Sequence, residues 1–398
     1  MKFQDQADLI IAQGALTNSK RPSTFIEGVY PTHLVKGSGC YVWDTNGNKY
    51  FDFICGLGCN ILGYAQEDIN KAIIMQLSQG ATLSLSTPHE LQLGYTIKSI
   101  FPFIERMKFL KTGTEACAAA VRIARAATNK DIILSEGYHG WSDGFVSLTD
   151  PSIGVPKRPP NTFQKLVDGD WDDNVAGVII EPVMTDFSPA RIDWLKALRE
   201  KCTKLGVILI FDEVITGFRF QKLSVANYLD IQPDIICLGK AIANGLPLAV
   251  VGGSKKIMNC GEYFVSSTFA GETLSLVAAQ KTIELLRSSH KIENLWLKGE
   301  AWLNEFNSYW PEGIRIEGYA TRGRFEGIPL VKALFFQEAI GAGMLFGPSW
   351  FFNFHLAEKS KVTLDGCKDI ICKIKSGTIK LKGKMPQSPF AEKIRQKI

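Results

Sequence analysis

Side chains able to do chemistry stand directly after short apolar runs of this sequence. Asp212 and Glu213 follow one such run, and Lys240 follows another after a single glycine. A lysine amine can form a Schiff base with an aldehyde cofactor when its pKa leaves some neutral amine. A buried carboxylate can keep a pyridine nitrogen protonated, and a protonated ring is an electron sink. The two residue types together point to amine–carbonyl chemistry on a ring cofactor.

Three further apolar runs end in residues that suit the same chemistry. Gly113 and Thr114 form a small-residue turn before a helical stretch, and such a turn offers backbone N–H groups to a phosphate. Tyr138, followed by His139, can stack its ring on a pyridine face. Glu181 follows the third run and adds a carboxylate. The convergence of these types at strand ends is the main functional signal.

Each of these residues also has a structural interpretation. The Gly-Thr turn resembles a common helix N-cap, and Tyr138 with His139 fits a tyrosine beside a satisfied histidine. Two adjacent acids after a buried run are costly unless they are paired or liganded. A structural salt bridge for Asp212 and a surface position for Lys240 stay open, but a functional role is favoured. His139 has no second ligand at helical spacing, so we expect no metal site.

The elements that must position these residues indicate an α/β fold. Between Met107 and about Gly253, short apolar runs alternate with helical stretches, which is typical of βαβ units and a mostly parallel sheet. Ligands of such sheets bind at the carboxyl ends of the strands. The predicted strands are Met107–Leu110, Ile132–Leu134, Ala176–Ile180, Val207–Phe211, Ile235–Leu238 and Leu248–Val251, and the predicted helices are Glu115–Thr128, Ile192–Leu205 and Leu276–Leu286.

The flanking segments indicate a second, smaller α/β domain. Residues 39–53 read as a β-hairpin around an Asn-Gly turn. Residues 309–327, rich in glycine and charge, read as a loop or edge strand, and residues 365–398 as a terminal helix and a tail. We therefore expect an N-terminal arm and hairpin over 1–55, a large domain over 56–280 and a C-terminal part of the small domain over 281–398.

Composition excludes several classes of protein. The 398 residues carry 45 Lys and Arg against 40 Asp and Glu, a net charge of +5, which is thin for nucleic-acid binding. Nine cysteines, an odd number without a CxxC pair, argue for reduced thiols rather than a disulfide framework. No apolar run approaches the roughly 18 residues of a membrane span, and no secretory signal is visible. We expect a cytoplasmic protein.

Two motifs resemble those of class III aminotransferases. They are Phe211-Asp212-Glu213-Val214-Ile215-Thr216-Gly217-Phe218-Arg219 and Asp234-Ile235-Ile236-Cys237-Leu238-Gly239-Lys240-Ala241-Ile242-Ala243-Asn244-Gly245-Leu246-Pro247. With Thr112-Gly113-Thr114-Glu115-Ala116 and Tyr138-His139-Gly140, the likeness runs from about Asn18 to His355, and the glutamate-1-semialdehyde aminomutase-like branch is the nearest. The resemblance implies a fold-type I enzyme that uses pyridoxal 5'-phosphate (PLP).

The resemblance also implies how the cofactor would be held. Lys240 would be the Schiff-base lysine and proton shuttle, and Asp212 would pair with the pyridine nitrogen. Tyr138 would stack on one face of the ring and Val214 would pack on the other. The phosphate would be held by a further pair of residues, Gly113 and Thr114.

Other residues carried over from the family concern the substrate and the partner subunit. The resemblance implies a homodimer with shared active sites, to which Thr268 of one subunit adds a phosphate contact in the other. Glu181 resembles a gating glutamate near the substrate. Arg21 falls near the position of an arginine that binds the substrate carboxylate in the aminomutases. Arg322 and Arg324 are candidates for a second carboxylate-binding arginine.

Two departures bear on the reaction. The segment after Gly140 reaches Gly154-Val155-Pro156 quickly, whereas aminomutases carry a longer gating loop there. The family's usual Ser-Gly-Asn-Pro is replaced by Ala270-Gly271-Glu272-Thr273. These departures favour an aminotransferase that moves an amino group from an amino acid to an aldehyde or ketone, such as a sugar or small phosphorylated carbonyl. An aminomutase is the alternative, and a non-catalytic α/β binding protein is a remote one.

Overall fold

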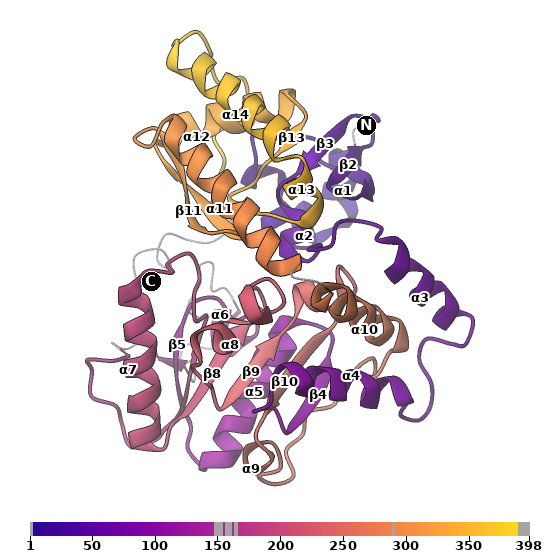
Figure 1. The fold of residues 1–398 in the computed structure, drawn as a ribbon, viewed down its shortest axis with the longest axis vertical. Helices are drawn as coiled ribbons and strands as arrows, with labels where there is room; N and C mark the ends of the chain where they lie inside the picture. The colour runs from indigo at the N-terminus through magenta and orange to yellow at the C-terminus, as the bar shows by residue number, and fades with distance from the viewer. Residues whose placement is uncertain (1–2, 147–153, 156–160, 163–165, 289–290, 389–398) are drawn as a thin grey trace. The chain divides into compact units, whose positions relative to one another are not determined.

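A computed structural model describes residues 3–146, 154–155, 161–162, 166–288 and 291–388 (Figure 1). The chain forms two compact units. One unit joins the N-terminal part, up to Gln66, to the part that starts at Glu293, and the other spans Glu67–Ile292. Each unit is described by itself below.

A seven-stranded sheet forms the middle of the unit that starts at Glu67, in the order β4-β10-β9-β8-β7-β5-β6. Strand β10 is antiparallel to both neighbours, and the other recorded pairs are parallel. The predicted α/β architecture with a mostly parallel sheet is confirmed. The strands are β4 (Arg106–Leu110), β5 (Ile132–Glu136), β6 (Asn161–Thr162), β7 (Val175–Ile180), β8 (Ile208–Glu213), β9 (Ile235–Leu238) and β10 (Ala249–Gly253).

Helix α5 packs against β7, β8, β9 and β10. Its small residues Ala116 and Ala120 are buried in one core with Ile179 of β7 and Ile210 of β8, so the helix can lie close to the sheet. The helices of this unit are α3 (Glu67–Leu77), α4 (Pro88–Ile100), α5 (Gly113–Thr128), α6 (Asp143–Val146), α7 (Pro189–Leu205), α8 (Val225–Leu229), α9 (Lys255–Met258) and α10 (Thr273–Arg287), with 3-10 turns η4 (Gln221–Leu223) and η5 (Lys240–Ala243).

The predicted strands and helices of this unit lie within about two or three residues of the observed ones, with one informative difference. Strand β8 does not end at Phe211 but continues through Asp212 and Glu213, which pair with Cys237 and Leu238 of β9. Because successive side chains of a strand point to opposite faces, the two acids face different surroundings.

The other unit contains two small sheets. The predicted hairpin is present as β2 and β3 in a four-stranded sheet of order β1-β2-β3-β13. Residues 309–327, predicted as a loop or edge strand, form an antiparallel hairpin in which β11 is an edge strand and β12 the central strand of the sheet β11-β12-β14. These strands are β1 (Leu34–Ser38), β2 (Tyr41–Asp44), β3 (Lys49–Asp52), β11 (Ile314–Tyr319), β12 (Arg322–Gly327), β13 (Met344–Leu345) and β14 (Ser349–Phe351).

An aromatic core holds this unit together. Trp302 of α11 stacks on Trp350 with ring centroids 5.3 Å apart, and on Phe306 at the same separation. The helical segments of the unit are α1 (Phe3–Ile10), η1 (Ala12–Gly14), η2 (Asn18–Lys20), η3 (Pro22–Thr24), α2 (Cys55–Gly58), α11 (Lys291–Tyr309), α12 (Pro329–Gly341), α13 (Phe354–Glu358) and α14 (Ser360–Lys375). The predicted terminal helix is α14, which starts before residue 365; residues 389–398 lie outside the described part.

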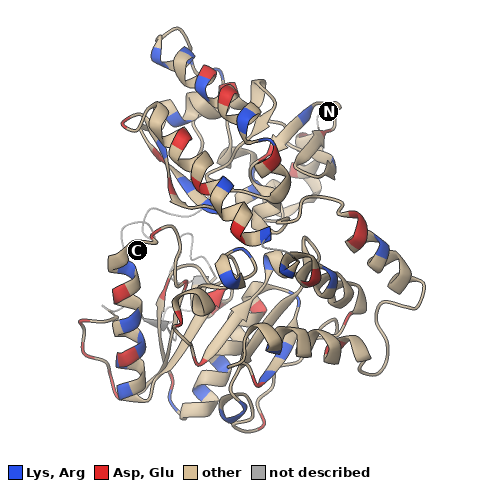
Figure 2. Ribbon diagram, viewed as in Figure 1, with Lys and Arg blue, Asp and Glu red and all other residues tan. Residues whose placement is uncertain are grey.

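Charged residues of both signs are interspersed along the helices, as along α7 (Figure 2). This distribution agrees with the small net charge of +5. Among the described residues, no helix combines the length and the hydropathy that crossing a bilayer requires.

Candidate active site

The carboxyl ends of β8 and β9 carry the two residues on which the sequence argument rests. Asp212 is the penultimate residue of β8, and Lys240 follows β9 after Gly239 as the first residue of η5. The two side chains are near enough for the Lys240 charge to help lower the pKa of Asp212. Lys240 has a left-handed φ of 42°, a strained conformation for a residue with a side chain. The ends of β8 and β9 therefore bring Asp212 and Lys240 close together, as the sequence predicts.

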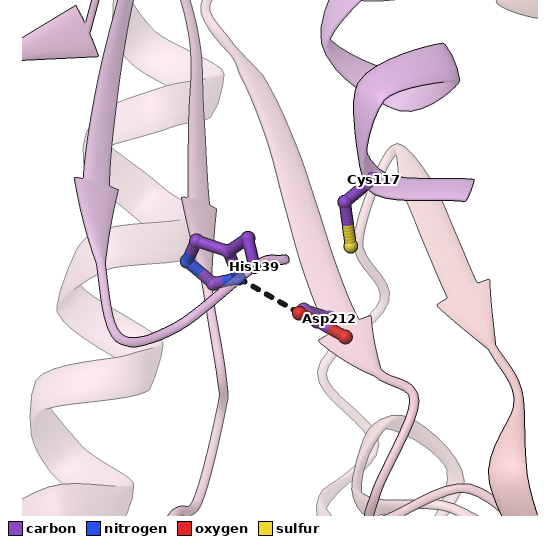
Figure 3. Close-up of side chains that lie close together, drawn as sticks. All are labelled: Cys117, His139 and Asp212. Carbon is purple, nitrogen blue, oxygen red and sulfur yellow. Dashed lines mark hydrogen bonds and ion pairs between the residues drawn. The ribbon is translucent and has the colours of Figure 1, made fainter. Parts of the chain in front are cut away.

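Asp212 is paired with His139, which follows β5 (Figure 3). His139 Nδ1 lies 2.7 Å from Asp212 Oδ2, and Nε2 lies 2.9 Å from the carbonyl oxygen of Glu136. Because a carbonyl oxygen only accepts, Nε2 carries a proton, and the carboxylate takes a second one from Nδ1. The ring is therefore an imidazolium, and neither nitrogen keeps a lone pair for a metal ion.

The surroundings hold both members of this pair in their charged forms. Burial opposes the charge on His139, but its hydrogen bond to Asp212 and the Asp212 charge raise its pKa to about 10. Burial likewise raises the pKa of Asp212, yet the hydrogen bond and charge of His139 and the Val214 N–H bring it below the usual value. An ionised carboxylate only 5% exposed is thus available to a positively charged partner.

Cys117 of α5 completes the cluster shown in Figure 3. One ligand atom from each of Cys117, His139 and Asp212 lies within 4.8 Å of the others. A hydrogen bond to Cys237, burial and the Asp212 charge raise the pKa of the Cys117 thiol well above its ordinary value. The thiol is therefore neutral, and with an imidazolium beside it the cluster does not offer the ligands that a metal requires.

Glu213, adjacent to Asp212, has a separate structural role. It is fully buried and accepts hydrogen bonds of 2.9 Å from the Thr216 and Ser224 hydroxyls and from the Val225 and Ala226 N–H groups. These bonds fix the loop between β8 and α8. Only Asp212 of the two acids contributes to the candidate site.

A turn between β4 and α5 carries the predicted phosphate-binding residues. Thr112 caps α5 by accepting from the Glu115 N–H at 3.2 Å, and Glu115 accepts from the Lys111 and Thr112 N–H groups, each at 2.9 Å. This capping box leaves the N–H groups of Gly113 and Thr114, in the first turn of α5, without partners within the helix. Such groups, aligned with the helix dipole, favour an anion.

Val214 brings this turn beside the segment that precedes Lys240. A methyl group built on Gly113 would lie 2.8 Å from Val214 Cγ1, and one built on Gly239 would lie 3.2 Å from the same atom. Gly140, at φ 107°, passes so close to Thr114 that a side chain there would collide with its hydroxyl. Glycines at these three positions let the three backbone segments approach their neighbours closely.

Tyr138 and Glu181 lie on neighbouring strand ends. Tyr138 is 41% exposed, although it sits beside the buried His139. Glu181 is 7% exposed, and its Oε1 would be 3.5 Å from a methyl group on Gly137. The Glu181 carboxylate therefore lies against the loop that carries Tyr138.

The remaining predicted residues are placed less directly. Thr268 is exposed in the turn before α10. Arg21 belongs to the other unit, where its guanidinium donates to Gln13 Oε1. Arg324 pairs with Glu326 on β12, and Arg322 is buried on the same strand. The roles proposed for Thr268 and Arg21 stay predictions.

Sequence reasoning missed three contributors. The local pattern at His139 predicts only a satisfied histidine, whereas its actual partner, Asp212, lies 73 residues away in the chain. Arg191 of α7 donates to Glu136 Oε1 at 2.9 Å and to the Pro182 and Glu181 carbonyls at 3.0 and 3.1 Å, which clamps the ends of β5 and β7 together. Lys111 forms an ion pair with Glu272. No local pattern signals any of these long-range pairs.

The donor set fits PLP. An ionised buried carboxylate suits a protonated pyridine nitrogen, a lysine near it suits an aldehyde carbon, and the N–H groups of Gly113 and Thr114 suit a phosphate. A side chain at position 113 would collide with Val214, so glycine there lets the turn lie directly against that residue. The geometry contains each group that the cofactor needs.

Comparisons with known proteins find similar enzymes. Glutamate-1-semialdehyde 2,1-aminomutase of Aquifex aeolicus is 35% identical over 300 residues, 69% of this chain and 71% of that protein. The aminomutase of Neisseria meningitidis serogroup C is 33% identical over 390 residues, 87% of this chain and 91% of that protein.

Solved structures share the fold. The FumI protein of a Sphingopyxis species, solved with PLP, superposes with a TM-score of 0.87 at 21% identity over 96% of this chain and 97% of that one. An omega-transaminase from Sphaerobacter thermophilus gives a TM-score of 0.81 at 22% identity over 94% and 97%. The fold is therefore that of the fold-type I PLP-dependent transferases.

A family model described as aminotransferase class-III matches residues 26–166 and 156–309. The predicted membership and the predicted cofactor are both confirmed. The chain belongs to the class III aminotransferases, and it is a PLP-dependent enzyme.

Proposed function

We propose that this enzyme moves an amino group within one substrate, as a glutamate-1-semialdehyde 2,1-aminomutase. The Asp212–His139 pair beside Lys240 supports the PLP-dependent amine chemistry. The aminomutase relatives, up to 35% identical, support the intramolecular form of it. The relatives therefore favour the aminomutase over the intermolecular aminotransferase, which the departures from the family pattern favour.

PLP, when bound, supplies an aldehyde for amines and an electron sink for carbanions. Gly113 and Thr114 would bind its phosphate through backbone N–H groups and a hydroxyl, and Tyr138 and Val214 would contact opposite faces of its ring. Asp212 holds negative charge where a protonated ring nitrogen needs it, and the His139 imidazolium fixes the orientation of that carboxylate. Lys240 Nζ would take a proton from the substrate carbon and return it as a general base and acid.

The substrate contacts are proposals of the same kind. Glu181 is placed beside the Tyr138 loop, where a carboxylate could govern access to the cofactor. Arg21 would bind the substrate carboxylate. We assign the unit Glu67–Ile292 as the large cofactor-binding domain and the other unit as the small domain.

A homodimer is part of the proposal. Large apolar side chains are exposed on α3, α4 and the loops before α4 and before α10. The two loops meet where the Thr273 N–H donates to the Ala81 carbonyl at 2.8 Å. Such a surface marks an interface. The exposed residues are Ile74, Met75, Leu77, Leu83, Leu85, Leu91, Tyr95, Phe264 and Phe269.

Light scattering tests the dimer. We expect a mass twice the 44.0 kDa of the chain. Leu85→Glu with Tyr95→Glu should give a monomer, and Leu205→Glu, at an apolar site on α7 that is 44% exposed against 85% for Leu85, should not. A monomeric wild type would refute this part of the proposal.

The reaction itself is tested with glutamate 1-semialdehyde as the only substrate. An aminomutase converts it over many turnovers, without an added amino donor, to the isomer with the amine on the terminal carbon and a ketone beside it. Nuclear magnetic resonance distinguishes the two isomers. Consumption of the semialdehyde that gives none of this isomer, stops near one equivalent per site and resumes with an amino acid donor would instead establish the intermolecular transferase.

The second candidate, that transferase, is favoured by one specific observation. The chain passes from Gly140 to Gly154-Val155-Pro156 with a shorter segment than the aminomutases have. Most of this segment lies outside the described residues. The acceptor of the amino group in this transferase reaction would be an aldehyde or ketone.

A further inference from the structure

An ion pair connects the phosphate-binding turn to helix α10. Lys111 Nζ lies 3.0 Å from Glu272 Oε2, and the two side chains are only 13% and 15% exposed. The two residues are 161 positions apart in the chain. Pairs this well shielded are screened less by salt than surface pairs and can fix a geometry.

Glu272 is itself held firmly. It caps α10 by accepting from the Leu274 N–H at 2.6 Å and the Ser275 N–H at 3.2 Å, and from the Ser275 hydroxyl at 2.7 Å. Although burial opposes ionisation, these bonds and Lys111 keep its pKa below the usual value. The start of α10 is fixed in turn by Thr273, whose N–H and hydroxyl bond to the Ala81 carbonyl. The carboxylate is thus a fixed anchor.

The other end of the pair reaches the phosphate-binding turn through its backbone. Lys111 immediately precedes the capping box, and its own N–H donates to Glu115 at 2.9 Å. Holding the Lys111 side chain therefore restrains the residues that lead into Gly113. Without Lys111, Glu272 would be an unpaired anion near the place of a phosphate dianion.

Helix α10 also packs against η5, whose first residue is Lys240. The same helix thus touches the lysine segment and, through Glu272, the phosphate-binding turn. A cofactor bonded at Lys240 and held by its phosphate at Gly113 needs these two segments at a fixed spacing.

We propose that Lys111 and Glu272 are positioning residues. Together they hold the turn of Gly113 and Thr114 at the distance from Lys240 that a phosphorylated cofactor requires. This inference rests on the proposed cofactor-binding roles of that turn and of Lys240. It applies to a segment, Ala270-Gly271-Glu272-Thr273, where this chain departs from the family pattern.

The test is equilibrium binding of PLP to the apo protein, measured by absorbance, for Lys111→Met, Glu272→Gln and the double variant. Each single variant should raise the Kd for PLP about tenfold, and the double variant should be no worse than either single one, because both remove one coupled pair. Lys111→Arg, which keeps the charge, should bind nearly as the wild type does. Lys281→Met removes an exposed pair with Glu284 on the same helix and should change nothing.

Binding of a second ligand, pyridoxal, distinguishes a specific effect on the phosphate-binding turn from a general loss of folded structure. Pyridoxal, which lacks the phosphate, should bind the variants and the wild type with the same Kd. An equal loss for pyridoxal and PLP would overturn the inference, because the pair would then support the fold alone. Tighter or unchanged PLP binding by Glu272→Gln beside weaker binding by Lys111→Met would also overturn it, since Lys111 would then act without its partner.

Failure of the proposed function would look different. A wild type that binds PLP but does not isomerise the semialdehyde contradicts the aminomutase assignment and leaves the pair's effect on Kd intact. Variants that bind PLP as the wild type does contradict only the role of Lys111 and Glu272.

Discussion

His139 and Asp212 are joined by a hydrogen bond of 2.7 Å between Nδ1 and Oδ2, and both side chains are buried. The second ring nitrogen of His139 donates to the Glu136 carbonyl, so the histidine is charged and cannot rotate without losing a bond. An ionised Asp212 in a fixed orientation is what a protonated pyridine nitrogen requires. The pair connects the fold of β5 and β8 to the chemistry of the cofactor.

The raised pKa of His139 predicts a pH dependence of stability. Its folded-state pKa of about 10 lies above the ordinary histidine pKa of 6.5. The stabilisation from its charge is therefore complete below about pH 6.5 and is lost as pH rises toward 10. Urea unfolding of the apo protein between pH 6 and 10 should show a falling free energy of unfolding in the wild type.

The control for that experiment is His139→Gln. This variant keeps a donor for Asp212 but cannot carry the charge, so it should lose about 3 kcal/mol at pH 6 and depend less on pH. Identical pH slopes for the two proteins would show that His139 is not charged in the folded state.

Loss of charge at Asp212 should lower activity, whereas loss of charge at Glu213 should lower stability. Asp212→Asn should slow turnover roughly a hundredfold or more and weaken PLP binding, because it removes the charge that we propose pairs with the ring nitrogen. Glu213→Gln should lower the free energy of unfolding by about 2 kcal/mol, since an amide presents a donor to groups that are all donors. The measurements are turnover, PLP titration and urea unfolding of both variants. Unchanged turnover in Asp212→Asn would remove its assigned role.

The close approach of Gly113 to Val214 predicts that a side chain at position 113 is unfavourable. Gly113→Ala should destabilise the apo protein by about 1 kcal/mol, because the new methyl group would lie 2.8 Å from Val214 Cγ1. Adding Val214→Ala should recover part of that loss, which a double-mutant cycle by urea unfolding measures. Strictly additive effects would show that the two residues do not meet.

Much of the sheet could be predicted from the sequence because its strands are buried on both faces. Val175–Ile180 is wholly buried and reads as one apolar run. The end of β8 was harder, because Asp212 and Glu213 look like the start of a loop. Their pairing with β9 and the four donors around Glu213 make acids acceptable inside a strand.

The hairpin of β11 and β12 is only partly predictable, as a loop or edge strand, for a related reason. Ile314, Ile316 and Tyr319 are buried, whereas Glu317 and Gly318 are both exposed, so burial does not alternate strictly along the strand. Charge and glycine there suggest a loop when only neighbouring residues are considered.

The candidate site was predictable in part. Asp212, Lys240 and the Gly113 turn each carry a local motif. His139 with Asp212, and Lys111 with Glu272, are pairs of residues far apart in sequence, and only the folded sheet and α10 bring them together.

The most direct measurement of the central claim is the visible absorbance of the purified protein with PLP, before and after borohydride, for the wild type and Lys240→Ala. The wild type should show a visible band that borohydride abolishes, with the reduced cofactor retained on the peptide that contains Lys240. Lys240→Ala should stay folded, bind PLP reversibly without that linkage and lose turnover. A wild type whose cofactor is attached at another lysine, or a Lys240→Ala variant with full turnover, would contradict the account.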